Sequence, residues 1–234
     1  MVWAKTTDYL PYFPYPSKTA QSPTRRSHFV RELIHMTIPI ILASGSEIRS
    51  ALLSNAGIAH SVEKPRVDED TMKAALVAEG ATTRDIADAL AEMKAMKVAS
   101  RHPEALVIGC DQVLDFKGDV LSKPASPEDA IAQLTKMRGQ DHRLLSAAVI
   151  YYQGEPVWRH VGVVRLTMDV ISDAYLTDYV ARNWDSIRWS VGSYKLEEEG
   201  LRLFTKVEGD YFHVLGIPMI ELIAYLKRRG AIAA

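Results

Sequence analysis

Two serines and an arginine follow an apolar segment in the order expected of a phosphate site. Residues 38–43 favour a β-strand, and Ser44, Gly45 and Ser46 break it before a helical pattern with Arg49 in its first turn. A helix start leaves N–H groups unpaired and carries the positive end of the helix dipole, so it attracts anions. Ser46 suits the N-cap, and the Arg49 guanidinium can hold two phosphate oxygens. The same residues also fit an ordinary strand–helix unit with a surface arginine.

Two carboxylates are candidates for acid–base chemistry or for holding a metal ion. Asp111 directly follows the apolar segment 105–110, a place where α/β sheets often present reactive groups. Glu69 lies in a separate charged loop. Each also has an ordinary interpretation, because Asp111 could close a turn and Glu69 is one of several charges between Arg66 and Asp70. The neighbouring Cys110 ends an apolar strand, where a cysteine is usually inert packing.

Two lysines add positive charge that could neutralise phosphates. Lys123 precedes Pro124, which keeps the lysine backbone extended. Lys94 lies late in an alanine-rich helical segment, where by itself it fits better on a solvated face. No phosphate-binding loop of the form GxxxxGK[ST] occurs in the chain.

Taken in order and at their spacings, these residues resemble the motifs of the Maf family of nucleotide pyrophosphatases. The resemblance covers roughly residues 36–230 and is carried by five short motifs. They are S-x-S-x-x-R (Ser44, Ser46, Arg49), D-E (Asp68, Glu69), K-A (Lys94, Ala95), G-x-D-x-V (Gly109, Asp111, Val113) and K-P (Lys123, Pro124).

The resemblance implies a fold, a reaction and a set of catalytic residues. The fold is a single ITPase-like α/β domain, with a mixed, twisted sheet flanked by helices and a cleft between two lobes. The activity is that of a hydrolase that cuts a nucleoside triphosphate into a monophosphate and pyrophosphate. Asp111, Glu69, Lys94 and Lys123 are then the catalytic residues. Two carboxylates beside a triphosphate would repel it, so Mg²⁺ or Mn²⁺ held by Glu69 and Asp111 is implied.

Three positions bear on the choice of base within the family: Ile48, Gln112 and Glu197. Together with Ser44, Ser46 and Arg49, they form the predicted substrate-binding set. Members that prefer dTTP and UTP carry arginine, threonine and glutamine at these three positions. The subfamily that hydrolyses 7-methyl-GTP carries an aromatic residue, glutamine and glutamate. Gln112 and Glu197 match this subfamily, and Ile48 matches neither.

The chemistry of the bases favours the same choice. A carboxylate only accepts hydrogen bonds, and the guanine edge offers two N–H donors side by side. Uracil and thymine place one N–H between two carbonyls, which Glu197 would not satisfy. Glu197 also begins a run of three glutamates, which fits an ordinary solvated loop.

Composition sets limits on other functions. The chain has 234 residues, 47% hydrophobic, with a formal net charge of −1, so a nucleic-acid coat or a polybasic membrane binder is not expected. One cysteine excludes an internal disulfide and fits the cytoplasm. The seven histidines show no ligand spacing, so a zinc site is not expected.

The periodicity from residue 36 onward alternates between strands and helices, as in an α/β fold with a mixed sheet. Strands are predicted over 38–43, 105–110, 112–116, 120–121, 144–152, 156–168, 201–207 and 211–215. Helices are predicted over 47–56, 71–79, 84–101, 127–137, 172–182 and 218–230.

Residues 1–35 have a different character. They alternate prolines with aromatics over 10–16 and show neither helical nor strand periodicity. Met36 precedes the first strand, so we expect the 36–234 domain to carry the fold and activity. The alternative is an extended docking arm.

Three classes of function remain open at this stage. The first is the pyrophosphatase, with a nucleotide as partner and, as in many Maf relatives, a homodimer. The second is a nucleotide-binding regulator of cell division, since the family was first linked with septum formation. The third is an interaction module that uses the N-terminal arm.

Overall fold

A seven-stranded mixed sheet forms the centre of the domain. The computed structural model describes residues 38–233, so the predicted extension over 1–35 lies outside the described residues. The strands follow the order β2-β1-β3-β5-β6-β7, and β4 pairs with β3. Their bounds are β1 (Ile40–Ala43), β2 (Ser61–Val62), β3 (Leu106–Phe116), β4 (Asp119–Leu121), β5 (Asp141–Tyr152), β6 (Glu155–Met168) and β7 (Phe204–Glu208).

The sheet is parallel at one edge and antiparallel elsewhere. β1 runs parallel to both β2 and β3, whereas β3, β5, β6 and β7 form successive antiparallel pairs. The parallel pairing of β1 with β3 ends at Ala43 and Gly109. β3 continues for seven residues beyond that point, so its second half lies past the end of β1.

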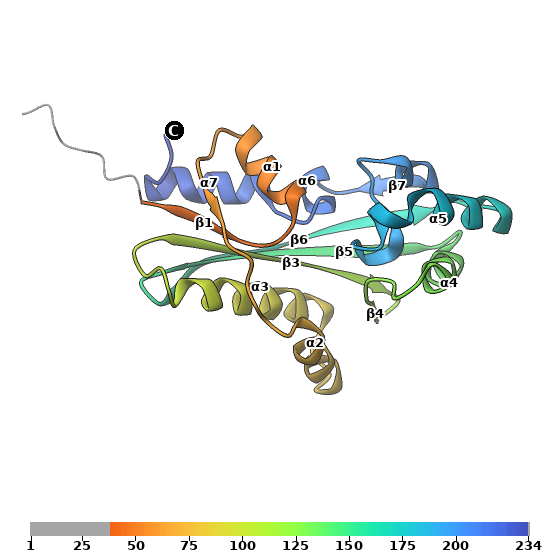
Figure 1. Cartoon of the computed structure of the whole chain (residues 1–234), viewed down its shortest axis with the longest axis horizontal. Helices are drawn as coiled ribbons and strands as arrows, with labels where there is room; N and C mark the ends of the chain where they lie inside the picture. Colours follow the sequence, from red (N-terminus) through yellow and green to blue (C-terminus); the bar gives the residue numbers. More distant parts are fainter. Residues whose placement is uncertain (1–37, 234) are drawn as a thin grey trace, which may run out of the picture. The chain divides into compact units, whose positions relative to one another are not determined.

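Helices cover both faces of the sheet (Figure 1). α3 lies against one face, with α2 beside it, and α1 and α7 lie against the other. α4 and α5 pack against the half of the sheet that is antiparallel. The bounds are α1 (Glu47–Asn55), α2 (Glu69–Ala78), α3 (Thr83–Ala99), α4 (Pro127–Met137), α5 (Asp173–Ile187), α6 (Tyr211–Val214) and α7 (Met219–Arg229), with 3₁₀ turns η1 (Val191–Ser193) and η2 (Glu199–Leu203).

The alternation of side chains along β3 explains why two helical layers form. Val107 and Val113 join the core under α3, whereas Leu106 and Ile108 join the core under α7. Successive residues of a strand point to opposite faces, so a run that is apolar at every position needs cover on both sides. The expected mixed α/β sheet is confirmed, and no helix within residues 38–233 is long and apolar enough to cross a bilayer.

Three local predictions are wrong. The strand predicted over 201–207 begins only at Phe204, since Glu199–Leu203 form the 3₁₀ turn η2. Residues 105–110 and 112–116 form the single strand β3, so Asp111 lies inside a strand instead of directly after one. The predicted strand 211–215 is the short helix α6, because the Asp210 side chain accepts from the Phe212 N–H at 2.7 Å and caps a helical turn. Sequence periodicity also missed the two-residue strand β2.

His142 gives the domain a predictable response to acid. Its ring is buried, its Nε2 lies 2.7 Å from the Tyr194 hydroxyl, and its Nδ1 has no partner within residues 38–233. Burial lowers the pKa of His142 from 6.5 to about 4, against the opposing charge of Asp141. The folded protein therefore holds this ring neutral, and the unfolded chain binds a proton more readily. The stabilisation is complete above pH 6.5 and is lost as the pH falls toward 4.

We expect His142→Phe to flatten this pH dependence. Phenylalanine keeps the ring contacts with Tyr194 and Phe204 but cannot titrate. Urea unfolding of the wild type at pH 7 and pH 4.5 should show a loss on the order of 2–3 kcal/mol from this group, and the variant should lack that part. An equal loss in both proteins would contradict the assignment.

Candidate active site

The candidate site lies where β3 runs past the end of β1. Ala43 pairs with Gly109 at the end of β1, so the next residue along each chain segment, Ser44 or Cys110, lies at the same level of the sheet. α1 begins three residues after Ser44. Because a parallel pair directs both strand ends the same way, this point gathers side chains from β1, α1 and β3.

Ser44 and Arg49 are held together at the start of α1. The Ser44 hydroxyl accepts from the Ser46 N–H at 3.2 Å and from Arg49 Nη1 at 3.3 Å, and Arg49 Nη1 also donates to the Cys110 carbonyl at 3.0 Å. Arg49 Nε is buried without an acceptor within residues 38–233. Ser46 is the N-cap by position, but its side chain makes no capping hydrogen bond, contrary to expectation. An unsatisfied guanidinium N–H and an uncommitted hydroxyl both suit an anionic ligand.

Gly216 packs against the Arg49 guanidinium, which also contacts Ser44 and Cys110. Its φ is +87°, and a Cβ built there would lie 2.7 Å from Arg49 Nη2. Only glycine accommodates both this backbone angle and this approach. The segment after α6 therefore closes over the arginine.

Lys94 joins the two predicted carboxylates. Its Nζ lies 2.6 Å from Asp111 Oδ1 and 2.9 Å from Glu69 Oε2, and its side chain is 8% exposed. The solvated helix face is therefore wrong for Lys94, which points into the protein. The second oxygen of each carboxylate has no hydrogen bond within residues 38–233. One strand and two helices thus bring together three of the four predicted catalytic residues.

A close approach of α3 to β3 makes this contact possible. Gly109 lies against α3, where a Cβ would come within 2.2 Å of the Ala91 carbonyl oxygen and 2.5 Å of the Ala95 nitrogen. Lys94 is next to Ala95 on the helix, and Asp111 lies two residues beyond Gly109 on the same face of the strand. The missing side chain at Gly109 therefore sets how near Lys94 comes to Asp111.

The electrostatics of the centre differ between Asp111 and Cys110. Burial raises the pKa of the Asp111 carboxyl, while the charges of Lys94 and Arg49 oppose that rise. A carboxylate with a raised pKa is a better base. Burial raises the pKa of Cys110 to about 11, despite Arg49 and Lys94, so this thiol stays protonated and is not a nucleophile.

Gln112 connects the site to α6. Its Nε2 lies within donating distance of the carbonyl oxygens of His213 (3.0 Å) and Val214 (2.9 Å), and of the Ser146 hydroxyl (3.0 Å). Its amide nitrogen is therefore committed to the protein. Gln112 positions the segment that carries Tyr211 and Gly216, and its Oε1 has no hydrogen bond within residues 38–233.

The three consecutive glutamates have different surroundings. Glu198 accepts from Ser186 and Lys195, and Glu199 accepts from groups on α5. Glu197 is exposed and makes no hydrogen bond or ion pair within residues 38–233. Burial and the charge of Glu197 raise the pKa of the half-exposed Tyr211. Glu197 is therefore a free carboxylate near an exposed aromatic ring.

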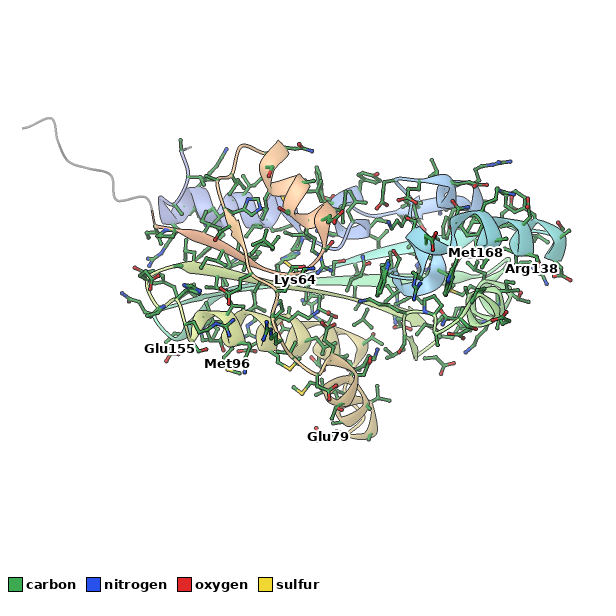
Figure 2. The ribbon with its side chains drawn as sticks, in the orientation of Figure 1. Lys64, Glu79, Met96, Arg138, Glu155 and Met168 are labelled. Atoms are coloured by element: carbon green, nitrogen blue, oxygen red, sulfur yellow. The ribbon has the colours of Figure 1, made fainter. Side chains whose placement is uncertain are left out.

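Lys123 and Ile48 make few contacts with the other predicted site residues, and the sequence pattern does not indicate Lys64, a lysine beside the serine turn. Lys123 is exposed and has no polar partner in the described part of the chain, and Ile48 is half-buried in the first turn of α1. The Lys64 stem lies against Gly45 of the serine turn, since a Cβ on that glycine would be 3.4 Å from Lys64 Cε. Figure 2 labels Lys64 on the segment between β2 and α2. No periodicity marks this residue, because it lies in an irregular segment.

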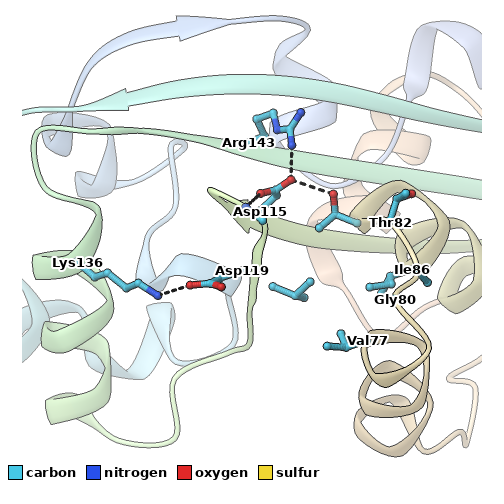
Figure 3. Close-up of a pocket in the computed structure, with 12 residues that line it drawn as sticks. Val77, Gly80, Thr82, Ile86, Asp115, Asp119, Lys136 and Arg143 are labelled. Atoms are coloured by element: carbon cyan, nitrogen blue, oxygen red, sulfur yellow. Dashed lines mark hydrogen bonds and ion pairs between the residues drawn. The ribbon is translucent and has the colours of Figure 1, made fainter.

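A separate pocket of about 700 Å³ lies between α2, α3 and the β3–β4 hairpin. Figure 3 shows Asp115 at its wall, bonded to Arg143 and a threonine. Thr83 and the Gly118 N–H donate to Asp115 at 2.9 and 2.8 Å, so this buried carboxylate is satisfied by the protein. None of Ser44, Arg49, Lys94 and Asp111 lines the pocket.

Comparison with known proteins gives relatives along most of the chain. The sequence profile described as Maf-like protein matches residues 39–229. A nucleoside triphosphate pyrophosphatase of Ruegeria pomeroyi is 64% identical over 197 residues, which are 84% of this chain and 99% of that protein. A 7-methyl-GTP pyrophosphatase of Brucella abortus is 42% identical over the same shares of each chain. A solved nucleoside-triphosphatase / dITP/XTP pyrophosphatase of Mycobacterium abscessus is more distant, with 15% identity and a TM-score of 0.37 over 82% of this chain and 95% of that one.

Proposed function

Because this chain belongs to the Maf family, we propose that it is a nucleoside triphosphate pyrophosphatase that cleaves the α–β phosphate bond and releases a monophosphate and pyrophosphate. The observation that carries the proposal is the buried Lys94 between Glu69 and Asp111, beside the anion turn of Ser44 and Arg49. Burying the charges of Lys94 and Asp111 costs stability. A protein that only bound nucleotides, as in the cell-division alternative, would gain little from such a centre.

The residues divide into a phosphate-binding group and a proton-accepting group. Ser46 and Arg49 offer the uncommitted hydroxyl and N–H donors that would hold the triphosphate, and Lys64 adds exposed positive charge beside the serine turn. Lys123, which is exposed, is proposed as a further cation for the phosphates. Asp111 Oδ2 has no partner within residues 38–233 and would take the proton of the attacking water. Lys94 holds Oδ1 of the same carboxylate, so the base is oriented before the substrate arrives.

The carboxylate pair also fits Mg²⁺ or Mn²⁺. Glu69 and Asp111 supply hard oxygen donors, and each retains one oxygen that is not bonded to Lys94. Such an ion would neutralise phosphate charge and acidify a coordinated water. Glu69 at the first turn of α2 is 41% exposed on its side chain, so the oxygen donors are open to solvent.

We propose 7-methyl-GTP, or another guanine-type triphosphate, as the preferred substrate. Glu197 supports this choice, because its carboxylate has no partner within residues 38–233, whereas those of the next two residues, Glu198 and Glu199, are bonded to the protein. A free carboxylate can accept from the N1–H and N2–H groups of guanine, and it favours the positive charge of the methylated base. The exposed Tyr211 ring nearby offers a stacking surface. The alternative within the family is a dTTP/UTP pyrophosphatase.

The test is a comparison of kcat/KM for 7-methyl-GTP, GTP, UTP and dTTP with Mg²⁺. We expect at least tenfold preference for 7-methyl-GTP over UTP and dTTP, because a mismatched base leaves polar groups unpaired. Glu197→Gln should reduce that preference. Glu198→Gln is the matched control, since its carboxylate is bonded to Ser186 and Lys195.

Two outcomes would contradict the substrate proposal. One is faster hydrolysis of UTP or dTTP than of 7-methyl-GTP by the wild type. The other is an unchanged preference in Glu197→Gln. Pyrophosphate release from any of the four nucleotides would still support the general activity, and release from none of them would count against it.

A further inference from the structure

Three side chains outside the proposed active site point their ligating atoms at one another. His160 on β6, His213 on α6 and Glu221 on α7 each offer one atom, and these atoms all lie within 4.8 Å of one another. His213 Nε2 lies 3.2 Å from one Glu221 oxygen, and His160 Nε2 lies 3.6 Å from the other. The residues are 8 to 61 positions apart in sequence, so their spacing gives no sign of the cluster.

The surrounding structure holds these side chains in place. Gly162 follows His160 on the same face of β6, and its missing side chain makes room for the His213 ring: a Cβ there would lie 2.2 Å from His213 Nδ1. The His213 carbonyl accepts from Ser146 Oγ at 2.5 Å and from Gln112 Nε2 at 3.0 Å. His160 stacks on Trp158, with ring centroids 6.3 Å apart.

We propose that His160, His213 and Glu221 form a binding site for a transition-metal dication of the zinc class. Two imidazoles and one carboxylate are a donor set that Zn²⁺ uses, whereas Mg²⁺ prefers oxygen alone. With metal–ligand bonds of about 2.0–2.1 Å, tetrahedral ligand atoms are roughly 3.3 Å apart. The two histidine nitrogens lie 3.2 and 3.6 Å from different oxygens of Glu221, which is close to that value. The three ligand atoms all lie within 4.8 Å of one another, so small side-chain rotations would bring them to tetrahedral spacing.

The site is also accessible and coupled to its surroundings. The side chains of His160 and Glu221 are about one-third exposed, which gives an ion an entry path and leaves the fourth position to water. A bound ion would join β6, α6 and α7. Because Gln112 donates to the His213 carbonyl, the ion would also steady the segment that closes over Arg49.

The test uses the full chain, freed of any affinity tag and of metal, and titrates it with Zn²⁺ by calorimetry. We expect one equivalent to bind and to raise the melting temperature, and Co²⁺ to give visible bands of a four- or five-coordinate ion. His160→Ala and Glu221→Gln should each weaken Zn²⁺ binding by more than tenfold. Losing a residue that only hydrogen-bonds to a metal ligand already costs about tenfold or more, and losing a ligand itself should cost more. Mg²⁺ should not compete with Zn²⁺ for this cluster, and a melting-temperature shift that Mg²⁺ causes at the Glu69–Asp111 pair should be equal in the wild type, His160→Ala and Glu221→Gln.

His102→Ala is the matched control, because His102 is another partly exposed histidine paired with a carboxylate, Glu63, at 2.8 Å. It should bind Zn²⁺ as the wild type does. Far-UV circular dichroism of each variant without metal reports whether it is folded. The proposal is overturned if folded His160→Ala and Glu221→Gln bind Zn²⁺ as tightly as His102→Ala, or if the wild type binds none at micromolar concentration.

Discussion

Replacing Asp111 with asparagine is expected to lower pyrophosphate release by about 10²–10⁴-fold while the protein stays folded. Asparagine has nearly the same shape and can keep an oxygen toward Lys94, which lies 2.6 Å from Asp111 Oδ1 in the wild type. It cannot take a proton from water, and it is a poorer ligand for a divalent cation. The effect should therefore appear in kcat at saturating substrate and Mg²⁺.

The control for this variant is Asp119→Asn, which changes an exposed carboxylate that pairs with Lys136. That variant should keep wild-type turnover. Melting temperatures of both variants separate a loss of chemistry from a loss of structure. If folded Asp111→Asn retained turnover close to that of the wild type, Asp111 would have no place in the reaction.

Lys94→Met should be the most damaging change for stability and activity together. Methionine fills much of the same space but leaves Asp111 and Glu69 without the ammonium that lies 2.6 and 2.9 Å from them. Removing one partner from a buried ion pair costs about 3 kcal/mol or more, which is roughly 6–12 °C in melting temperature for a domain of this size. Turnover should fall by about 10²-fold or more, since Asp111 loses the group that orients it.

Lys97→Met is the matched control, because Lys97 is exposed one helical turn further along α3. It should change neither property. Lys94→Met also tests the carboxylate pair as a metal site. Mn²⁺ should raise the melting temperature of Lys94→Met more than that of the wild type, because the two carboxylates then lack their internal cation. An unaltered melting temperature in Lys94→Met would contradict the energetic role given to this lysine.

The parts of the fold that sequence predicted well are those set by local chemistry. α4 was predicted at its observed bounds, and local chemistry sets its start: Ser126 is the N-cap and Pro127 lies in the first turn. α7 ends where Gly230 adopts a left-handed backbone, and the β5–β6 hairpin turns at Gln153 and Gly154, between the strands predicted over 144–152 and 156–168. Each of these signals is a property of neighbouring residues.

The misses arise where distant parts of the chain decide the outcome. Asp111 was placed after a strand because the polar pair with Gln112 interrupts an apolar run, yet β5 pairs with β3 across that position. By its sequence Lys94 fits a solvated helix face, but the close packing of α3 on Gly109 turns this lysine toward Asp111. Ser46 has the right type for a cap but no capping bond. Local pattern cannot report such tertiary contacts.

In the candidate site, too, the sequence indicates residues that belong to motifs and misses those that only tertiary contacts bring together. The motif order indicated Ser44, Arg49, Lys94 and Asp111, and the structure brings these four residues to the meeting point of β1, α1, α3 and β3. Lys64 and the cluster of His160, His213 and Glu221 lay beyond sequence reasoning, because only the folded arrangement of separate elements puts them together. Their roles, like that of Lys123, remain predictions.

The close packing at Gly109 has a consequence for genetics. This residue carries no functional group, yet any side chain there must push α3 away from β3, and Lys94 moves with the helix. In a screen of random substitutions scored only for activity, changes at Gly109 should therefore be recovered among those at Asp111 and Lys94. A reader of such a screen would count one catalytic residue too many. Selection for activity would therefore retain glycine at this position for its lack of a Cβ atom, which sets the spacing between α3 and β3.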